Sequence, residues 1–312
     1  MKKKEAYVTV IGGVNIDVIG IPNNDLILQD SNPGIVKIAL GGVGRNIAEN
    51  LVKLGVDTKL ISAIGDDIYG QKVLNEARLQ GINMQDSLIL KRHPTSIYLA
   101  VLDENRDMKV AISHMDIFDK LDIDFIKNKN SLIKKTQVCV IDTNIPKDVI
   151  EYVLVNNKET DFFLDTVSTI KSLKIKDLIG YFHTIKPNKI EAEMLSGIKI
   201  NSEKDLETCA EYFLNKGVKR TFISLGAKGV YYSDGVNKKH LFAHEVSLVN
   251  STGAGDAFMA ALVYCFNKGY DIDYSARFAM AASGLTLTHE DTINPNMSVK
   301  NVINFMDNKE VL

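Results

Sequence analysis

Short apolar runs alternate with amphipathic stretches along most of the 312-residue chain. Tyr7–Ile11 is a run of β-forming residues that ends at two glycines. Residues 45–54 repeat their apolar side chains at helical spacing, and a glycine follows them. Parallel strands need long, usually helical, connections, so this rhythm predicts an α/β fold with a mostly parallel sheet covered by helices.

Three stretches break the rhythm. Residues 97–102 and 108–112 alternate apolar and polar side chains around the polar segment 103–107, which predicts a β-hairpin. Residues 14–21 and 34–40 also suit strands, with no helix between them. We expect these stretches, with the hairpin region taken as about 95–113, to form a small inserted sheet that acts as a lid. No linker or repeat interrupts the chain, so we expect one domain over 1–312.

Composition limits the classes of partner. The formal charge is −2 with 24% charged residues, so no basic field indicates nucleic-acid binding. No apolar run approaches the roughly 18 residues that span a bilayer, and no secretory signal follows the lysines at positions 2–4. Cys139, Cys209 and Cys265 are far apart, as expected of reduced thiols in a cytoplasmic protein. We expect small-molecule ligands, with neither nucleic acid nor membrane as partner.

Residues 250–256, Asn-Ser-Thr-Gly-Ala-Gly-Asp, have the composition of an anion site. Residues 246–250 suit the end of a strand, and residues 254–268 suit a helix that is closed by Gly269. Glycines at a helix start let the backbone approach a ligand. The N–H groups of the first turn have no intrahelical acceptor and lie at the positive end of the helix dipole. Such donors can hold the charge of a transferring phosphoryl group.

Asp256 falls in the first turn of this helix, which is apolar nearly all round and is therefore expected to be buried. A buried carboxylate is unfavourable unless it has partners. One interpretation is a general base that is aimed at a substrate hydroxyl. The other is an acid that only satisfies the helix N-terminus. A Gly-x-Gly at a helix start does not decide between them.

Four motifs resemble those of the ribokinase-like (PfkB) carbohydrate kinases, in the same order and over essentially the whole chain. They are Gly-Gly-Val-Gly-Arg-Asn-Ile-Ala at 41–48, Lys-Pro-Asn-Lys-Ile-Glu at 186–191, Ser-Leu-Gly-Ala-Lys-Gly at 224–229 and Ser-Thr-Gly-Ala-Gly-Asp-Ala-Phe at 251–258. The resemblance implies a three-layer αβα domain with the small sheet as its lid. It also implies ATP and Mg²⁺ as donor and cofactor, and Asp256 as the base.

The resemblance assigns further roles by motif. It places the anion-stabilising amides at Gly253, Ala254 and Gly255 beside Asp256. The implied acceptor-binding residues are Asn15, Asp17, Gly41, Gly42, Asn46 and Asn144. The implied ATP-binding residues are Asn188, Glu191, Ser224, Gly226 and Gly229, and Glu191 would act on Mg²⁺ through water. Asn188 and Glu191 also fit a helix cap with a first-turn acid, which stays open as an alternative.

Within the family, Asp-Ser-Asn-Pro-Gly at 30–34 and Thr-Ile-Asn-Pro-Asn-Met-Ser at 292–298 resemble the branch that phosphorylates the 5′-hydroxyl of pseudouridine. Another sugar or nucleoside kinase, for ribose, uridine or fructose, is the alternative. A ligand sensor without catalysis is disfavoured by the intact Gly-Ala-Gly-Asp, and a nicotinamide oxidoreductase by the lack of a dinucleotide fingerprint. The family often forms homodimers through its lid sheets, so a homodimer is expected.

Two positions depart from the family pattern. Asn250 stands where the family usually has an aspartate that helps bind a monovalent cation, which puts a K⁺ site in doubt. His114 stands where an aspartate is expected in the pseudouridine branch. We expect His114 to be a partly exposed residue of the lid rather than a ligand of the acceptor.

Overall fold

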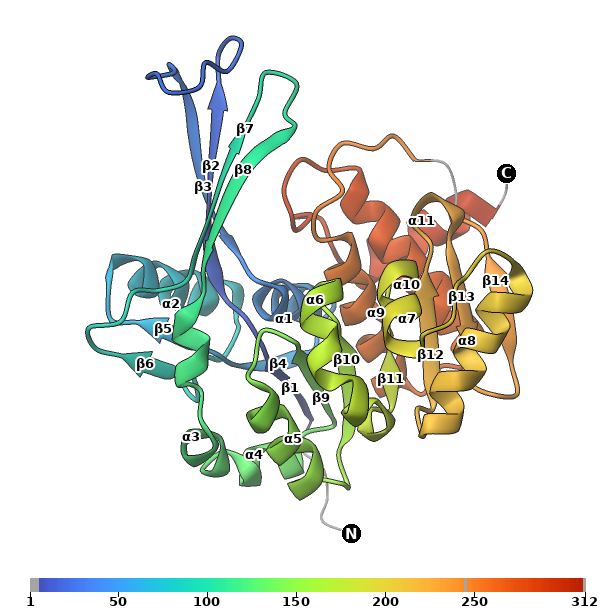
Figure 1. Ribbon diagram of the computed structural model, residues 1–312. Helices are drawn as coiled ribbons and strands as arrows, with labels where there is room; N and C mark the ends of the chain where they lie inside the picture. The colour runs from blue at the N-terminus through green and yellow to red at the C-terminus, as the bar shows by residue number, and fades with distance from the viewer. Residues whose placement is uncertain (1–5, 244–245, 311–312) are drawn as a thin grey trace.

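The computed structural model describes residues 6–243 and 246–310, and its centre is an eight-stranded sheet (Figure 1). The strand order is β14-β13-β12-β11-β10-β9-β1-β4. The strands from β4 to β12 in that order pair in parallel, whereas β13 and β14 are antiparallel. Their bounds are β1 Tyr7–Ile11, β4 Asp57–Ile61, β9 Val138–Asp142, β10 Asp161–Asp165, β11 Thr184–Ile185, β12 Arg220–Ser224, β13 Val230–Ser233 and β14 Lys238–Leu241. The predicted mostly parallel sheet is confirmed.

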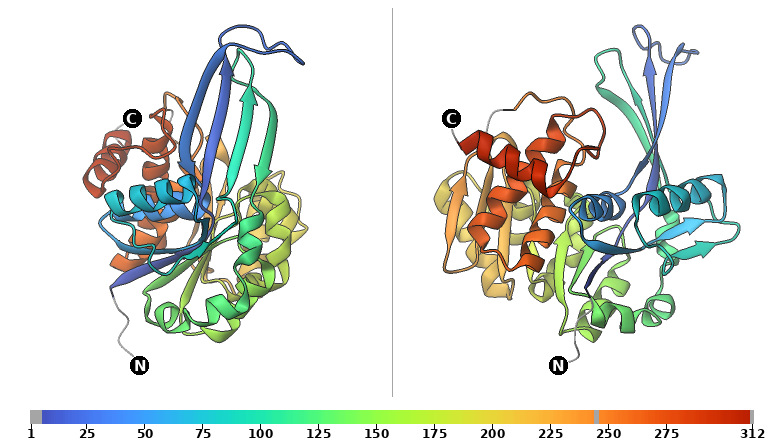
Figure 2. Two further views of the ribbon diagram at one scale, coloured as in Figure 1. Left: turned by 90° about the vertical axis from the view of Figure 1, so that its left-hand side faces the viewer. Right: turned by 180° about the vertical axis from the view of Figure 1, so that it is seen from behind.

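Helices cover both faces of this sheet, as Figure 1 and the view from behind in Figure 2 show. On one face lie α1 Val43–Lys53, α2 Ile68–Gln80, α9 Ala254–Lys268, α10 Ile272–Leu287 and α11 Val299–Glu310. On the other lie α3 Ile123–Lys127, α4 Asn130–Lys135, α5 Lys147–Asn156, α7 Lys189–Ser196 and α8 Glu203–Lys216. Short helical segments complete the chain: η1 Asp116–Lys120, α6 Thr169–Ser172, η2 Leu173–Tyr181 and η3 Gly226–Lys228. Within the described residues no helix is long and apolar enough to cross a bilayer.

Two apolar cores lie on the two faces of the sheet. Val8 and Val10 of β1 face the core beneath α1, α9 and α10, whereas Ile11 faces the core beneath α5 and α8. Because successive side chains of a strand point to opposite faces, a strand that is buried on both must be apolar throughout. This is the physical reason for the uninterrupted apolar runs in the sequence, and it confirms the three-layer αβα arrangement.

A four-stranded sheet extends away from the main body (Figures 1 and 2). Its strand order is β3-β2-β7-β8, and only the β2–β7 pairing is parallel. The strands are β2 Asn15–Pro22, β3 Gly34–Gly41, β7 Ile97–Leu102 and β8 Met108–His114, which lie within two residues of the stretches predicted for this sheet. A separate two-stranded sheet pairs β5 Ala63–Gly65 with β6 Leu88–Leu90.

One expected strand is absent. We expected residues 246–250 to form the end of a strand, but they are not part of any sheet. Instead, the N–H groups of Val249 and Asn250 both donate to the Leu287 carbonyl at the end of α10. The prediction was wrong because apolar side chains at Leu248 and Val249 suit a strand, while the structure leaves both largely exposed.

Candidate active site

Asp256 lies in the first turn of α9, where its side chain is almost completely buried. Gly253 precedes the helix with a φ of 82°, and a Cβ there would collide with the Thr292 carbonyl oxygen. From α1, the Asn46 Nδ2 atom donates a hydrogen bond of 2.8 Å to Asp256 Oδ2. Packing of α1 against α9 thus joins the two motifs that lie farthest apart in the chain.

The environment of Asp256 disfavours its charged form. Burial is the main cause, and the negative charge of Asp165 adds to it. The Asn46 hydrogen bond and the nearby Lys186 act in the opposite direction. The net effect raises the pKa of Asp256 from 3.8 to about 8. A carboxyl group that titrates near neutral pH is matched to accepting a proton from a hydroxyl group.

A buried charged cluster surrounds this carboxylate at the carboxyl ends of the parallel strands, where α/β proteins bind their ligands. Lys186 follows β11, and its Nζ atom lies 3.3 Å from Asp165 Oδ2 at the end of β10. Burial alone would lower the pKa of Lys186, but the carboxylates around it, Asp165 first, outweigh burial and raise it. Lys186 is therefore a fixed cation beside Asp256. Sequence reasoning missed this role, although a lysine directly after a buried strand is a recognisable signal.

A hollow of about 950 Å³ lies between the loop after β12 and helices α9 and α10. Of the predicted nucleotide residues, Ser224, Gly226 and Gly229 line it, and so do Ala254 and Gly255 of the predicted anion site. Its other lining residues are Lys186, Ala227, Leu241, Phe242, Ala243, Val246, Leu248, Ser251, Phe258, Arg277, Met280, Ala281, Ser283, Gly284, Leu287, Phe305 and Met306. The hollow is thus mostly apolar, and Lys186 and the start of α9 lie at its polar part.

Asn188 and Glu191 form a capping box at the start of α7 and do not line this hollow. Asn188 Oδ1 accepts the Glu191 N–H group, and Glu191 Oε2 accepts the Asn188 N–H group, each at 2.9 Å. Thr166 Oγ1 donates to the same Glu191 oxygen at 2.5 Å. The residue after Thr166, Val167, has a φ of 57°, an unfavourable value for a β-branched side chain. The helix-capping alternative therefore describes the observed contacts of this pair.

The predicted acceptor residues gather at the base of the small sheet. Asn15 of β2 pairs with Gly41 of β3, and Asn15 Nδ2 donates to Asp17 Oδ1 at 2.5 Å. A Cβ at Gly41 would collide with the Asp17 carboxylate in its present position, so the glycine lets this carboxylate lie close to β3. Burial raises the pKa of Asp17, although Asn15 and the Arg45 guanidinium oppose the change. Gly42, the N-cap of α1, packs against the backbone of residues 13 and 14.

Asn144 lies after β9, next to a buried carboxylate that sequence reasoning did not assign. Asp142 accepts the N–H groups of Gly13 at 2.7 Å and of Asn144 at 2.8 Å. Asn144 Oδ1 accepts from Lys171 Nζ at 2.6 Å, and Lys171 also reaches the Met115 sulfur. Burial lowers the pKa of Lys171. Asn144 is thus oriented by a cation that the sequence interpretation had not included.

Two departures from the family pattern can be placed. His114 is the last residue of β8 and is exposed, in line with the partly exposed residue of the lid that we expected. Asn250 Oδ1 accepts the Thr252 N–H group at 2.9 Å, while its Nδ2 donates to the Glu290 carbonyl at 2.8 Å. The amide is neutral, its oxygen accepts a hydrogen bond from the backbone, and its nitrogen faces the Glu290 carbonyl. Asn250 therefore offers a monovalent cation no negative charge.

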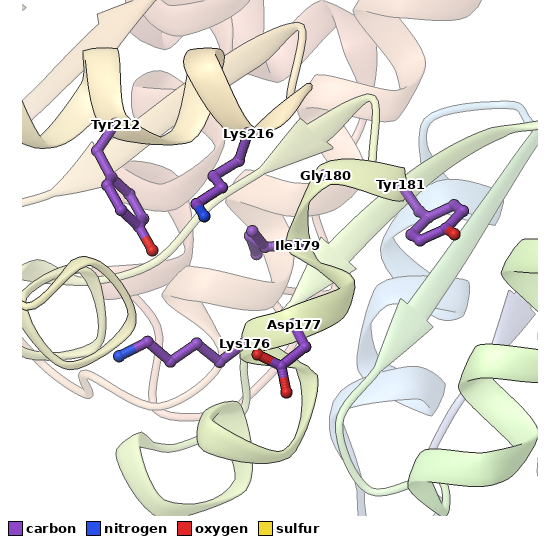
Figure 3. A pocket seen from close by; sticks show the side chains of 7 residues that line it. All are labelled: Lys176, Asp177, Ile179, Gly180, Tyr181, Tyr212 and Lys216. Carbon is purple, nitrogen blue, oxygen red and sulfur yellow. The ribbon is translucent and has the colours of Figure 1, made fainter.

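A second hollow, of about 510 Å³, lies where η2 meets the C-terminal half of α8. Tyr212 and Lys216 extend from α8 on one side of it, and Lys176 and Asp177 lie across from them on η2 (Figure 3). Its remaining lining residues are Ile179, Gly180 and Tyr181. None of the predicted site residues lines this hollow, so it is separate from the charged cluster around Asp256.

Comparisons with known proteins find similar chains and a matching family model. The family model described as "pfkB family carbohydrate kinase" matches residues 5–299. Pseudouridine kinase from Escherichia coli K12 is 40% identical, and the match covers 100% of both chains. A crystal structure of a putative sugar kinase from Clostridium perfringens is 40% identical with a TM-score of 0.89, covering 98% of this chain and 97% of that one. A putative ribokinase II from E. coli in complex with ATP and Mg²⁺ is 18% identical with a TM-score of 0.84, covering 97% and 100%.

Proposed function

Because this chain belongs to the pfkB family of carbohydrate kinases, and is therefore a phosphotransferase with an alcohol acceptor, we propose that it phosphorylates the 5′-hydroxyl of pseudouridine with ATP. The relative that is 40% identical over its full length supports the acceptor. The runner-up is another nucleoside or sugar of the same family, such as uridine, ribose or fructose.

One observation carries the proposal. Asp256 stands between the hollow lined by Ala254 and Gly255 and the acceptor-side residue Asn46. A base for phosphoryl transfer needs this place, since the hydroxyl that it deprotonates must meet the γ-phosphorus in line. Its burial and its pKa of about 8 fit a proton acceptor better than an acid that only caps a helix.

In the proposed reaction, Asp256 takes the proton of the 5′-hydroxyl while that oxygen attacks the γ-phosphorus. The bond from the γ-phosphorus to the β–γ bridging oxygen breaks, and ADP leaves. The N–H groups of Gly253, Ala254 and Gly255 hold the charge of the phosphoryl oxygens in the transition state. Lys186 adds a fixed positive charge beside them. We propose ATP as donor because Ser224, Gly226 and Gly229 line the adjoining hollow.

Mg²⁺ fits the residues near Lys186 only as an ion held mainly by phosphates and water. Within the described residues there is no group of three or more His, Cys, Asp or Glu side chains that could hold a metal. Mg²⁺ usually keeps several waters and takes one or two carboxylates, so Glu191 would hold it through water, with Asn188 fixing the start of α7. The bound ion would neutralise phosphate charge.

On the acceptor side, we propose that Asn15, Asp17 and Asn46 bind the ribosyl hydroxyls, with Gly41 and Gly42 allowing close approach. The carboxylate and amide groups can take the hydrogen bonds of vicinal hydroxyls. Asn144, which Lys171 orients, would contact the acceptor from the end of β9. The small sheet would close over this site as a lid and exclude water, which limits hydrolysis of ATP.

We further propose that catalysis does not depend on K⁺, because Asn250 offers a monovalent cation no negative charge. One experiment tests function and cation together: ADP release is measured with pseudouridine, uridine, ribose and fructose, each with and without K⁺. The expected result is preference for pseudouridine with no K⁺ effect. Preference for another acceptor would overturn the substrate, and no ADP release with any acceptor would overturn catalysis.

A homodimer through the small sheet is the proposed assembly. Ile38, Leu99 and Ile112 lie in one row across β3, β7 and β8, and all three are substantially exposed. Val110 extends the apolar surface, whereas the neighbouring position Asp17 points to the opposite face. An exposed apolar sheet face of this kind marks an interaction surface, and a second copy would cover it symmetrically.

A further inference from the structure

Arg45 lies in the first turn of α1 with only 13% of its side chain exposed. Its Nη1 atom donates to the Leu40 carbonyl of β3 and to Asn46 Oδ1, both at 3.3 Å. Its Nη2 atom pairs with Glu49 one turn further along α1. The guanidinium thus joins the small sheet to the side chain that contacts Asp256. None of the roles proposed above uses it.

The chemistry of the two groups fixes how the Asn46 amide must lie. A side-chain amide has a donor end and an acceptor end, whereas a guanidinium has donors only. The end of Asn46 that faces Arg45 must therefore be its oxygen, which leaves the NH₂ group for Asp256. A reversed amide would place two oxygens against each other and would favour a protonated Asp256.

We propose that Arg45 is a positioning residue: by holding the Asn46 oxygen, it keeps the Asn46 N–H group on the Asp256 carboxylate. The relay runs from Glu49 through Arg45 and Asn46 to Asp256, and the Leu40 contact ties it to the small sheet. This inference rests on the proposed role of Asp256 as the base.

The surroundings of Asp256 make this donor important. Asp165 at the end of β10 and Asp142 at the end of β9 both disfavour the charged carboxylate. The Asn46 hydrogen bond from α1 and the Lys186 charge after β11 favour it. Without a fixed Asn46 donor, less opposes burial and the two aspartates, so Asp256 would stay protonated to higher pH.

The test is the pH profile of kcat/KM for the acceptor at saturating ATP, which reports the acceptor-free enzyme. We expect Arg45→Met to shift the acid limb to higher pH by about one unit. At pH values below the pKa of the base kcat/KM should fall roughly tenfold, and at pH values above it kcat/KM should change little. Arg45→Lys keeps a charged donor and should restore part of the shift. The matched control is Arg78→Met, an exposed arginine on α2, which should leave the profile unchanged.

An even loss of kcat/KM at all pH values in Arg45→Met would show a merely structural role and overturn the proposal. The relay also requires that Arg45→Met has no effect on the acid limb once Asn46 is replaced by leucine. If Arg45→Met shifts the limb by the same amount in the Asn46→Leu variant as in the wild type, the proposal is overturned. If Arg45→Met does not fold, Asn46→Leu alone has to raise the limb. Asp256→Asn separates the two claims. Near-normal turnover of Asp256→Asn would overturn the proposed function. If Asp256→Asn is inactive but Arg45→Met leaves the acid limb in place, only the proposed role of Arg45 is overturned.

Discussion

Replacing the proposed base should make the protein more stable while it stops the reaction. The substitution is Asp256→Asn, which keeps the shape of the side chain and its reach to Asn46 but removes the charge. In the folded protein, burial and two neighbouring aspartates raise the pKa of Asp256 to about 8, against 3.8 when exposed. Between these two pKa values the unfolded chain releases a proton that the folded protein still holds, which costs stability, and function is the reason to keep the carboxyl group.

The size of the effect follows from the pKa difference. A carboxyl group whose folded pKa is raised contributes stability that is complete below about pH 4 and is lost as pH rises towards 8. The loss is about 1.4 kcal/mol per pH unit, or on the order of 4 kcal/mol at pH 7. This figure already includes the attraction of Lys186, which lowers the pKa of Asp256, so the expected gain for the variant at pH 7 is on the order of 4 kcal/mol. Turnover should fall by roughly 10² to 10⁴, as for a positioned base.

The assay compares urea unfolding of wild type and Asp256→Asn at several pH values between about 5 and 9. The advantage of the variant should grow with pH and level off above about pH 8. Asp57→Asn, at an exposed position at the start of β4, is the control and should show no such trend. A variant less stable than wild type at pH 7, or an advantage independent of pH, would refute the argument from burial. ADP release measured in parallel tests the base.

Three further predictions concern Lys186 beside the base, the apolar face of the small sheet and Asn250. Lys186→Met should lower kcat and move the acid limb of the pH profile upward, because it removes the positive charge that favours ionised Asp256; an unmoved limb would contradict the proposed charge balance. Ile112→Lys should convert the expected dimer into a monomer in light scattering, whereas Ser113→Lys on the other face of β8 should not; a monomeric wild type would reject the interface. Asn250→Asp should create a K⁺ stimulation of turnover, since it supplies a charge and removes the donor on the Glu290 carbonyl; equal rates in K⁺ and Na⁺ would show that this position does not control the cation.

The sequence predicted the elements near the site well where local signals were strong. The helix Ala254–Lys268 was placed to the residue, because Gly253 and Gly269 both adopt the left-handed conformation at its ends. The segment 246–250 failed, since apolar composition alone does not distinguish a strand from an exposed loop that closes a hollow. Strand bounds in the small sheet were right within two residues because the alternation of apolar and polar side chains reflects the pleat.

Site chemistry divides in the same way. The helix start that carries Asp256 and its glycine loop was identifiable because its signal lies within a few residues, but the resemblance of four motifs to the family was needed to favour a base over a helix cap. Lys186 and Arg45 both lie inside recognised motifs, yet their partners could not be named from the sequence. Their contacts join residues that are distant in the chain, and these depend on how β10, β11 and α1 end in space.

The sequence by itself determined the α/β class and the order of the motifs, because strand burial and helix termini are local properties of composition and spacing. The resemblance of those motifs to the family singled out the three-layer arrangement and the place of the proposed base. Tertiary structure alone decided which charges meet. It placed the Asn46 Nδ2 atom 2.8 Å from Asp256 Oδ2, although the two residues are 210 positions apart in the chain, and it paired Lys186 with Asp165. Electrostatic energy depends on distance and burial rather than on separation along the chain, so the titration of Asp256 is a property of the fold.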